Sequence, residues 1–219
     1  MGNSRSRMIG SIVLVIGGVR SGKSRFAQEL ALNLGGNDVL YVATAEPRDV
    51  EMERRIAHHR SSRPSSWQTL EKPLRTGAAI AEMGAIPSVI LLDCMTLLVS
   101  NILCDVFAVA NSEREVGLVC NEVDDLEGRV QKEVDDIIKV ADARNTNIII
   151  VSGEVGAGVV PDHAMGRIFR DMLGFANQRI ASQADATYWM VAGLPINATA
   201  LATNVEDAAK NHCQFKTQK

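Results

Sequence analysis

The stretch SIVLVIGGVRSGKSRFAQELALNLGG, residues 11–36, decides the fold class of this chain. Its first six residues form a continuous apolar run rich in β-branched side chains, which indicates a buried strand. The segment 24–34 carries apolar residues at helical spacing, and the two glycines that follow it indicate where a helix ends. The sequence therefore predicts a strand, a glycine-rich turn and a helix in direct succession.

The turn GGVRSGKS fits the pattern G-x-x-x-x-G-K-[ST], which binds nucleotide phosphates through backbone N–H groups. Lys23 is expected to reach the β- and γ-phosphates, and the Ser24 hydroxyl is expected to bind Mg²⁺. A turn that merely needs glycines is the alternative, but it does not explain Lys-Ser at the end of the pattern. The predicted nucleotide contacts are Gly17, Gly18, Val19, Arg20, Ser21, Gly22, Lys23 and Ser24.

A second apolar run, VILLD at 89–93, ends in an acid. A carboxylate at the end of a buried strand beside a phosphate loop commonly holds Mg²⁺, directly or through water. Asp93 is therefore the predicted second metal ligand beside Ser24. The alternative is that Asp93 only caps the turn that follows the strand.

The rest of the chain alternates strands with helices. Apolar runs predict further strands at 39–43, 147–152 and 186–191, and apolar periodicity predicts helices at 51–60, 74–83, 129–143 and 164–183. The acid-rich segment 104–128 lacks clean periodicity and is interpreted as a loop or lid. This alternation indicates an α/β fold with a mostly parallel sheet flanked by helices. One domain over 1–219 is expected, with 1–8 and about 200–219 loose or peripheral.

Composition excludes several classes of protein. The net charge of −3 argues against a general nucleic-acid binder, which is usually basic. The apolar runs are too short for a membrane span. The four cysteines show neither a CxxC pair nor a zinc-like spacing, and scattered thiols without a signal peptide predict a cytoplasmic location.

Two adjacent histidines stand in the charged segment RRIAHHRSSRP, residues 54–64. Adjacent helical residues are about 100° apart, so only one of the two can face a given site. His59 shares its face with Met52 and Ile56 and is expected to lean toward the protein body, whereas His58 projects from the polar face. A neutral imidazole at His58 could attack an α-phosphate and expel pyrophosphate. By the residues alone, a solvated helix face remains the commoner explanation.

The order of motifs resembles a known family. The resemblance is carried by GGVRSGKSRFAQ, VLYVATA, DVEMERRIAHHRSSRP, WQTLE, VILLDCMTLLVSN, GEVGAGVVP and GRIFRDMLGFANQRIASQADATYWMVAGLP, which together span about residues 11–196. They are similar to the bifunctional adenosylcobinamide kinase/adenosylcobinamide-phosphate guanylyltransferase family of cobalamin biosynthesis. The phosphate loop is common to many families, but the histidine block and the GEVGAGVVP block are much more specific.

The resemblance implies a RecA-like P-loop NTPase fold, a homotrimer, and two reactions on corrinoid substrates. ATP or GTP would phosphorylate adenosylcobinamide, and GTP would then donate GMP to the phosphate through a guanylylated histidine, which maps to His58. Mg²⁺ would assist. The resemblance extends the nucleotide contacts to Ala43, Thr44, Ala45, Arg60, Ser61, Ser62, Arg63, Glu71 and Asp93. The chain departs from the family at 104–128, in the tail beyond 196, and at Asp93, where some members carry Glu.

Two alternative functions remain open at this stage. A simple P-loop small-molecule kinase would transfer only the γ-phosphate and would form no nucleotidyl-enzyme. A nucleotide-binding switch would bind a nucleotide without turning over a small-molecule acceptor. The loop 152–161 follows a predicted strand, where α/β sheets bind ligands, so it is a candidate for ligand or subunit contact.

Overall fold

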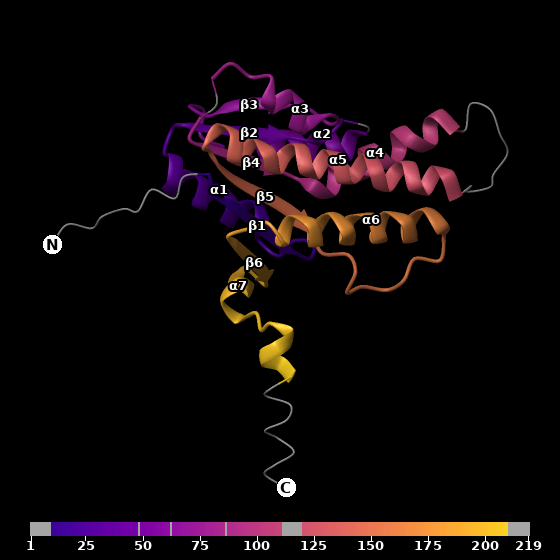
Figure 1. Ribbon diagram of the computed structural model, residues 1–219. Helices are drawn as coiled ribbons and strands as arrows, with labels where there is room; N and C mark the ends of the chain where they lie inside the picture. Colours follow the sequence, from indigo (N-terminus) through magenta and orange to yellow (C-terminus); the bar gives the residue numbers. More distant parts are fainter. Residues whose placement is uncertain (1–9, 48, 62, 86, 111–119, 210–219) are drawn as a thin grey trace, which may run out of the picture.

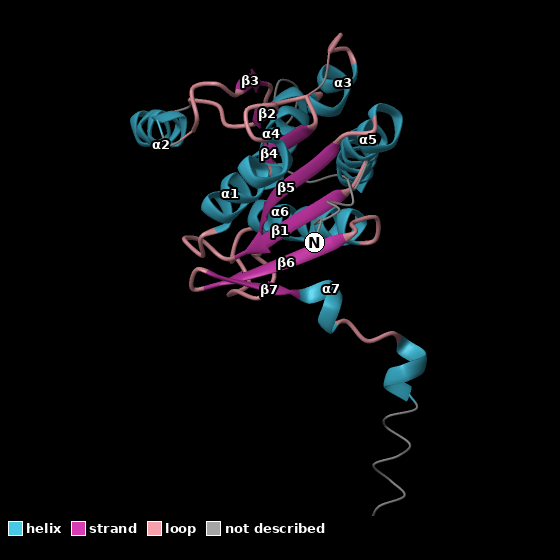
Figure 2. Ribbon diagram, turned by 90° about the vertical axis from the view of Figure 1, so that its left-hand side faces the viewer, coloured by secondary structure: helices cyan, strands magenta, loops and turns pink. Residues whose placement is uncertain are grey.

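The structure, a computed structural model, describes residues 10–47, 49–61, 63–85, 87–110 and 120–209. Its seven strands form one sheet in the order β3-β2-β4-β5-β1-β6-β7. Figure 1 shows this order from β3 at the top to β6, and Figure 2 also labels β7. All neighbouring pairs are parallel except β6 and β7, which are antiparallel. The predicted fold class, an α/β fold with a mostly parallel sheet flanked by helices, is confirmed.

The bounds of the elements agree closely with expectation for the central strands and for the helices α1, α2 and α6. The strands are β1 Ile12–Gly17, β2 Val39–Ala43, β3 Gln68–Glu71, β4 Val89–Asp93, β5 Asn147–Gly153, β6 Ala186–Val191 and β7 Leu194–Asn197. The helices are α1 Lys23–Gly35, α2 Val50–Ser61, α3 Thr76–Ala81, α4 Met95–Ala110, α5 Cys120–Arg144, α6 Ala164–Ala181 and α7 Ala198–Leu201.

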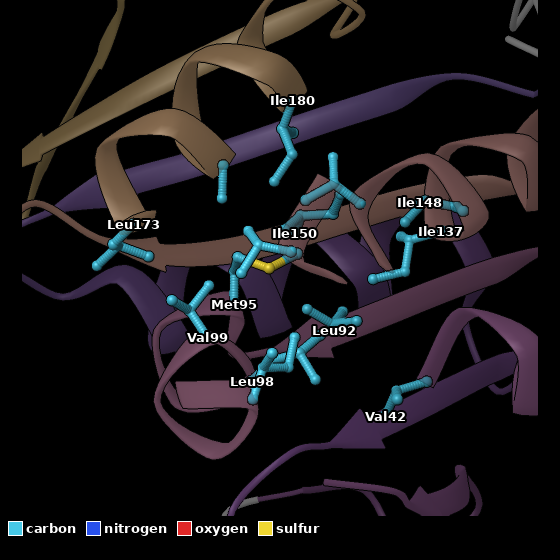
Figure 3. Close-up of a cluster of buried hydrophobic side chains, with 14 of the residues drawn as sticks. Val42, Leu92, Met95, Leu98, Val99, Ile137, Ile148, Ile150, Leu173 and Ile180 are labelled. Carbon is cyan, nitrogen blue, oxygen red and sulfur yellow. The ribbon is translucent and has the colours of Figure 1, made fainter. Parts of the chain in front are cut away.

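The sheet buries both of its faces, which is why its central strands are apolar throughout. Helix α1 covers one face, where Ala27 and Ala31 pack against Val15 and Tyr41. The other face is covered by α3, α4, α5 and α6, and Figure 2 shows α1 and α5 on opposite sides of the sheet. Figure 3 shows part of this second layer, with Ile150 of the sheet beside Met95 of α4 and with Leu173 of α6 to the left.

The prediction of a loop or lid at 104–128 is wrong for the residues that the structure describes. Helix α4 continues to Ala110 and α5 begins at Cys120, while 111–119 lie outside the described residues. Both helices pack along the sheet through buried positions at helical spacing. Examples are Leu98 and Ile102 in α4, and Leu126 and Val130 in α5. Gly128 does not interrupt α5 because it lies on the exposed face, with open space around it.

Three smaller differences lie outside the centre of the sheet. The helix expected at 74–83 is shorter, and β3 was not predicted because its residues are largely exposed. Beyond Pro195 the chain completes the β6–β7 hairpin and forms α7, where no pattern had been recognised. Every residue from Thr199 to Ala209 is exposed, in line with a peripheral tail, while 1–8 and 210–219 lie outside the described residues.

The parallel strands bring their carboxyl ends to a single edge of the sheet. The loop after β1 and the last residue of β4 both lie at this edge, although β5 stands between the two strands. The strand of Asp93 is therefore not the immediate neighbour of the phosphate-loop strand. None of the helices in the described ranges has the length and apolarity needed to cross a bilayer.

Candidate active site

The phosphate loop between β1 and α1 has a backbone that only small residues allow at two positions. A Cβ on Gly17 would lie 2.6 Å from the Met190 carbonyl oxygen and 2.9 Å from the Ser21 Oγ. Gly22 has a φ of +93° and precedes α1 directly. Arg20 also has a positive φ, of 56°. Such a sequence of turns aims successive N–H groups at one point, as an anion site requires.

Two side chains of the loop suit a phosphate ligand. The Ser21 hydroxyl is buried and has no hydrogen-bond partner among the described residues, which normally costs free energy unless a ligand supplies one. Lys23 donates from Nζ to the Gly18 carbonyl oxygen at 2.6 Å, so its amino group lies over the loop. Partial burial lowers the pKa of Lys23. An anionic ligand would offset this cost of burying the charge.

Ser24 and Asp93 come together at the carboxyl edge, as the sequence predicts. Ser24 Oγ lies 3.4 Å from Asp93 Oδ1, and the other carboxylate oxygen accepts a hydrogen bond of 2.7 Å from Tyr41 Oη. Two hard oxygen donors at this spacing fit Mg²⁺, which is commonly bound by one or two side chains and by substrate phosphates. In the described part of the chain, no cluster of three or more His, Cys, Asp or Glu side chains forms a closed metal cage.

The segment after β2 is attached to the residue that follows Asp93. Thr44 is fully buried; its Oγ1 donates to the Cys94 carbonyl oxygen at 2.7 Å and accepts from the Cys94 N–H at 2.9 Å. Its hydroxyl is thus used within the protein. Ala43 is buried and Ala45 is half-buried beside it. Burial raises the pKa of the Cys94 thiol to about 11, so this thiol is neutral at physiological pH.

Helix α2 carries the histidine pair and stands away from the sheet, as Figure 2 shows. None of its described side chains is buried. The side chain of His58 lies outside the described residues. His59 Nδ1 lies 4.0 Å from Asp93 Oδ2, so one turn of α2 lies beside the carboxylate at the phosphate edge. The expectation that His59 leans toward the protein body agrees with this contact.

The residues after the histidines make two further contacts. Arg60 forms an ion pair with Glu71 at the end of β3, and both side chains are more than half exposed. The Arg63 guanidinium lies 3.4 Å from the centroid of the Tyr41 ring, and its Nε is buried with no hydrogen-bond partner in the described ranges. Ser61 is exposed, and Ser62 lies outside the described residues.

The loop 154–162 begins at the same edge and is held in place by α6. The Glu154 N–H donates to the Gly17 carbonyl oxygen at 3.0 Å. Arg170 donates to the Gly156 carbonyl oxygen at 2.6 Å, and Arg167 donates to the Pro161 and Asp162 carbonyl oxygens. These arginines therefore fix the shape of the loop through its backbone.

Sequence reasoning missed one residue that touches the site. Tyr41 was treated only as part of a buried strand, yet its hydroxyl contacts Asp93 and its ring contacts Arg63. A usable signal was present, because Tyr41 is the one polar side chain in the run VLYVA. A buried tyrosine hydroxyl usually finds a hydrogen-bond partner.

The fold and the site together define a P-loop nucleotide-binding protein in which Ser24 and Asp93 meet beside the phosphate loop. A family model described as cobinamide kinase / cobinamide phosphate guanyltransferase matches residues 13–198. The chain belongs to this family. The match ends at the start of α7, so the exposed tail lies beyond it.

Three curated proteins are similar over most of their length. The bifunctional adenosylcobalamin biosynthesis protein CobP of Pseudomonas aeruginosa is 40% identical over 184 residues, covering 84% of this chain and 94% of that protein. The corresponding CobU proteins of Salmonella typhimurium and Escherichia coli are 35% and 34% identical, each covering 84% of this chain and 98% of the relative. The flagellar accessory protein FlaH of Methanocaldococcus jannaschii has a TM-score of 0.43 at 16% identity, over 86% of this chain and 76% of that one. This structural likeness is too weak to support an argument.

Proposed function

We propose that this chain carries out both reactions of its family at one nucleotide site, with His58 as the nucleophile of the second. In the first reaction, ATP or GTP phosphorylates adenosylcobinamide. In the second, GMP passes from GTP to adenosylcobinamide phosphate, giving adenosylcobinamide-GDP and pyrophosphate. The chain's membership of the family supports this assignment of substrates.

The observation that carries the proposal is the contact between α2 and the phosphate edge. His59 Nδ1 lies 4.0 Å from Asp93 Oδ2, and the same carboxylate lies beside Ser24 of the phosphate loop. His58 is the adjacent residue of the same helix, so its backbone is beside this edge. A nucleotide held by the loop would therefore present its phosphates close to the histidine pair.

The kinase step needs no covalent enzyme intermediate. The hydroxyl oxygen of adenosylcobinamide attacks the γ-phosphorus, the bond to the β-phosphate oxygen breaks, and the hydroxyl proton is lost to solvent or base. Lys23 and the loop N–H groups stabilise the charge that develops on the transferred group. Phosphoryl transfer depends mainly on such positioning and electrostatic stabilisation.

The guanylyl step takes place in two displacements. A neutral nitrogen of His58 attacks the α-phosphorus of GTP, the bond to the β-phosphate breaks, and pyrophosphate leaves. A phosphate oxygen of adenosylcobinamide phosphate then attacks the same phosphorus and breaks the P–N bond, which restores the imidazole. Arg60 and Arg63 follow His58 closely and supply positive charge near the reacting phosphate.

Ser24 and Asp93 are the residues that would hold Mg²⁺. When bound, the metal would neutralise phosphate charge and orient the triphosphate. The other nucleotide contacts proposed are the phosphate loop, the segment Ala43–Ala45, the segment Arg60–Arg63, and Glu71. We also propose a cytoplasmic homotrimer, as the family resemblance implies, and light scattering on the purified chain would test its oligomeric state.

Covalent labelling tests the proposal. The wild-type chain incubated with Mg²⁺ and α-labelled GTP should retain label that is acid-labile and alkali-stable, as a phosphoramidate is. GTP labelled at the γ-position should leave no label on the protein. His58→Ala should take up no label while keeping a wild-type unfolding temperature, and the neighbouring variant His59→Ala should still be labelled, at a lower rate.

The same experiment separates the alternatives. A simple kinase would transfer the γ-label to adenosylcobinamide without ever retaining the α-label. A nucleotide-binding switch would bind GTP but transfer neither label to a corrinoid. Normal labelling of His58→Ala would show that another side chain is the nucleophile.

A further inference from the structure

Tyr41 lies at the junction between the metal-binding carboxylate and the segment after α2. It sits in the middle of β2 with 1% of its surface exposed, among aliphatic neighbours of the layer under α1. A phenylalanine at this position would pack equally well against these neighbours. Its hydroxyl, however, is directed at one acceptor, Asp93 Oδ2, at 2.7 Å.

We propose that Tyr41 is a positioning residue whose hydroxyl orients Asp93 for the metal and whose ring seats Arg63 beside the nucleotide. This inference rests on the proposed function, in which Ser24 and Asp93 hold Mg²⁺. It assigns Tyr41 no contact with the reacting atoms.

The two carboxylate oxygens of Asp93 make different contacts. Oδ2 accepts the hydrogen bond from Tyr41 and faces His59, while Oδ1 remains 3.4 Å from Ser24 Oγ. A carboxylate fixed at one oxygen has less rotational freedom to lose when the other oxygen binds a cation. Residues that orient metal ligands in this way typically change metal affinity by about 10- to 100-fold when they are removed.

The ring makes the second contact. The Arg63 guanidinium lies over its face at 3.4 Å from the centroid, in a half-buried position. A cation over an aromatic face is stabilised more strongly the further it is removed from water. The segment that follows the histidine helix is therefore attached to the same side chain that orients Asp93.

Tyr41→Phe separates the two tasks because it removes only the hydroxyl. In the full-length chain, calorimetric binding of a non-hydrolysable GTP analogue is titrated with Mg²⁺ and repeated in EDTA. In Tyr41→Phe, we expect a rise of about tenfold in the Mg²⁺ concentration at which the increase in affinity for the GTP analogue is half-maximal. Metal-free binding should stay close to that of wild type.

A matched control is Tyr188→Phe on β6. Tyr188 also packs against α1, with its ring 5.1 Å from that of Phe26, and it stands on a strand separated from β4 by β1 and β5. Its loss of a hydroxyl should leave the Mg²⁺ dependence unchanged. An unchanged Mg²⁺ dependence in Tyr41→Phe, or an equal loss of binding with and without metal, would overturn the positioning role.

The ring contact is tested by Tyr41→Leu against Tyr41→Phe, with the unfolding temperature of each as the check on folding. At saturating Mg²⁺, guanylylation should be about two- to fivefold slower in the leucine variant than in the phenylalanine variant, because Arg63 loses its contact with an aromatic ring. Equal rates would refute this half of the inference. A wild-type chain whose nucleotide binding ignores Mg²⁺ would instead contradict the proposed metal site itself.

Discussion

The phosphate loop and helix α2 lie at the same edge of the sheet but are held in different ways. The loop continues a buried strand, and its Gly17 is closed in by Met190 and Ser21. Helix α2 has no buried side chain among those described, and its contacts with the body include that of His59 with Asp93 and the exposed ion pair Arg60–Glu71. The phosphate end of the site is thus part of the core, whereas the histidine end is attached to its surface.

This difference separates the energetic consequences expected from changes in the two regions. Substitutions at the enclosed positions of the loop, such as Gly17, should reduce both stability and activity, because the same close contacts support both. Substitutions on α2 should reduce guanylylation with little effect on the free energy of unfolding. A large loss of stability from a substitution on α2 would contradict the conclusion that this helix is attached only at the surface.

The largest effect is expected for Lys23→Ala. The amino group lies over the loop at 2.6 Å from the Gly18 carbonyl oxygen, where a bound phosphate would be reached. Its loss should lower the rates of both transfer reactions by about a hundredfold or more, as for other groups that stabilise developing charge. Steady-state assays of γ-label and α-label transfer check this, and a loss confined to one reaction would contradict a shared nucleotide site.

Gly17→Ala tests how tightly the loop is enclosed. The added Cβ would lie 2.6 Å from a backbone oxygen, so the free energy of unfolding should fall by about 1–3 kcal/mol. Gly18→Ala is the matched control, because a Cβ there meets nothing within 4 Å. Denaturant unfolding of the two variants should therefore differ clearly, and equal stabilities would mean that the loop is not enclosed by its neighbours.

Thr44→Val tests the attachment of β2 to the residue after Asp93. The isosteric change removes the two hydrogen bonds with Cys94 and leaves the half-buried Cys94 N–H without its acceptor, while the Cys94 carbonyl oxygen still accepts from the Leu98 N–H at 3.2 Å. The free energy of unfolding should fall by about 1–3 kcal/mol. Thr44→Ser, which keeps the hydroxyl, should recover much of that loss in the same unfolding assay. A valine variant as stable as wild type would show that these bonds contribute little.

The smallest effect on stability is expected at the surface of α2. The ion pair between Arg60 and Glu71 joins two side chains that are 62% and 52% exposed. Such pairs contribute about 0–1 kcal/mol, so Arg60→Ala should change the free energy of unfolding by less than about 1 kcal/mol. A double-mutant cycle with Glu71→Gln measures the pair directly. The guanylylation rate should fall even though the free energy of unfolding changes little. A rate that neither substitution changes would show that Arg60 and Glu71 do not contribute to the site.

The centre of the fold was predictable because its signals are local. The runs at 39–43, 89–93 and 186–191 are mostly apolar and match β2, β4 and β6 to the residue. Helix α4 was not predicted. Helix α5 was predicted only from 129, because acids and Gly128 on its exposed face obscured its buried positions, such as Leu126. Only packing against the sheet distinguishes this helix from an acid-rich loop.

The candidate site was predictable to a different degree at its two ends. Lys23, Ser24 and Asp93 follow from motif spacing and from the rule that parallel strands share one carboxyl edge. The role of His58 came from the resemblance, since an exposed charged helix gives no physical reason to prefer catalysis, and it stays a prediction. A polar side chain in an apolar run marks Tyr41 as unusual, but its partners, Asp93 and Arg63, cannot be identified from the sequence because they are 52 and 22 positions away along the chain.

The central claim, that His58 accepts GMP, is tested most directly by locating the modification. The full-length wild-type chain is incubated with GTP and Mg²⁺, digested at alkaline pH, and its peptides are fragmented in a mass spectrometer. GMP should be found on His58, with His59 in the same peptide unmodified. GMP on His59, on Lys23 or on any other residue would contradict the account.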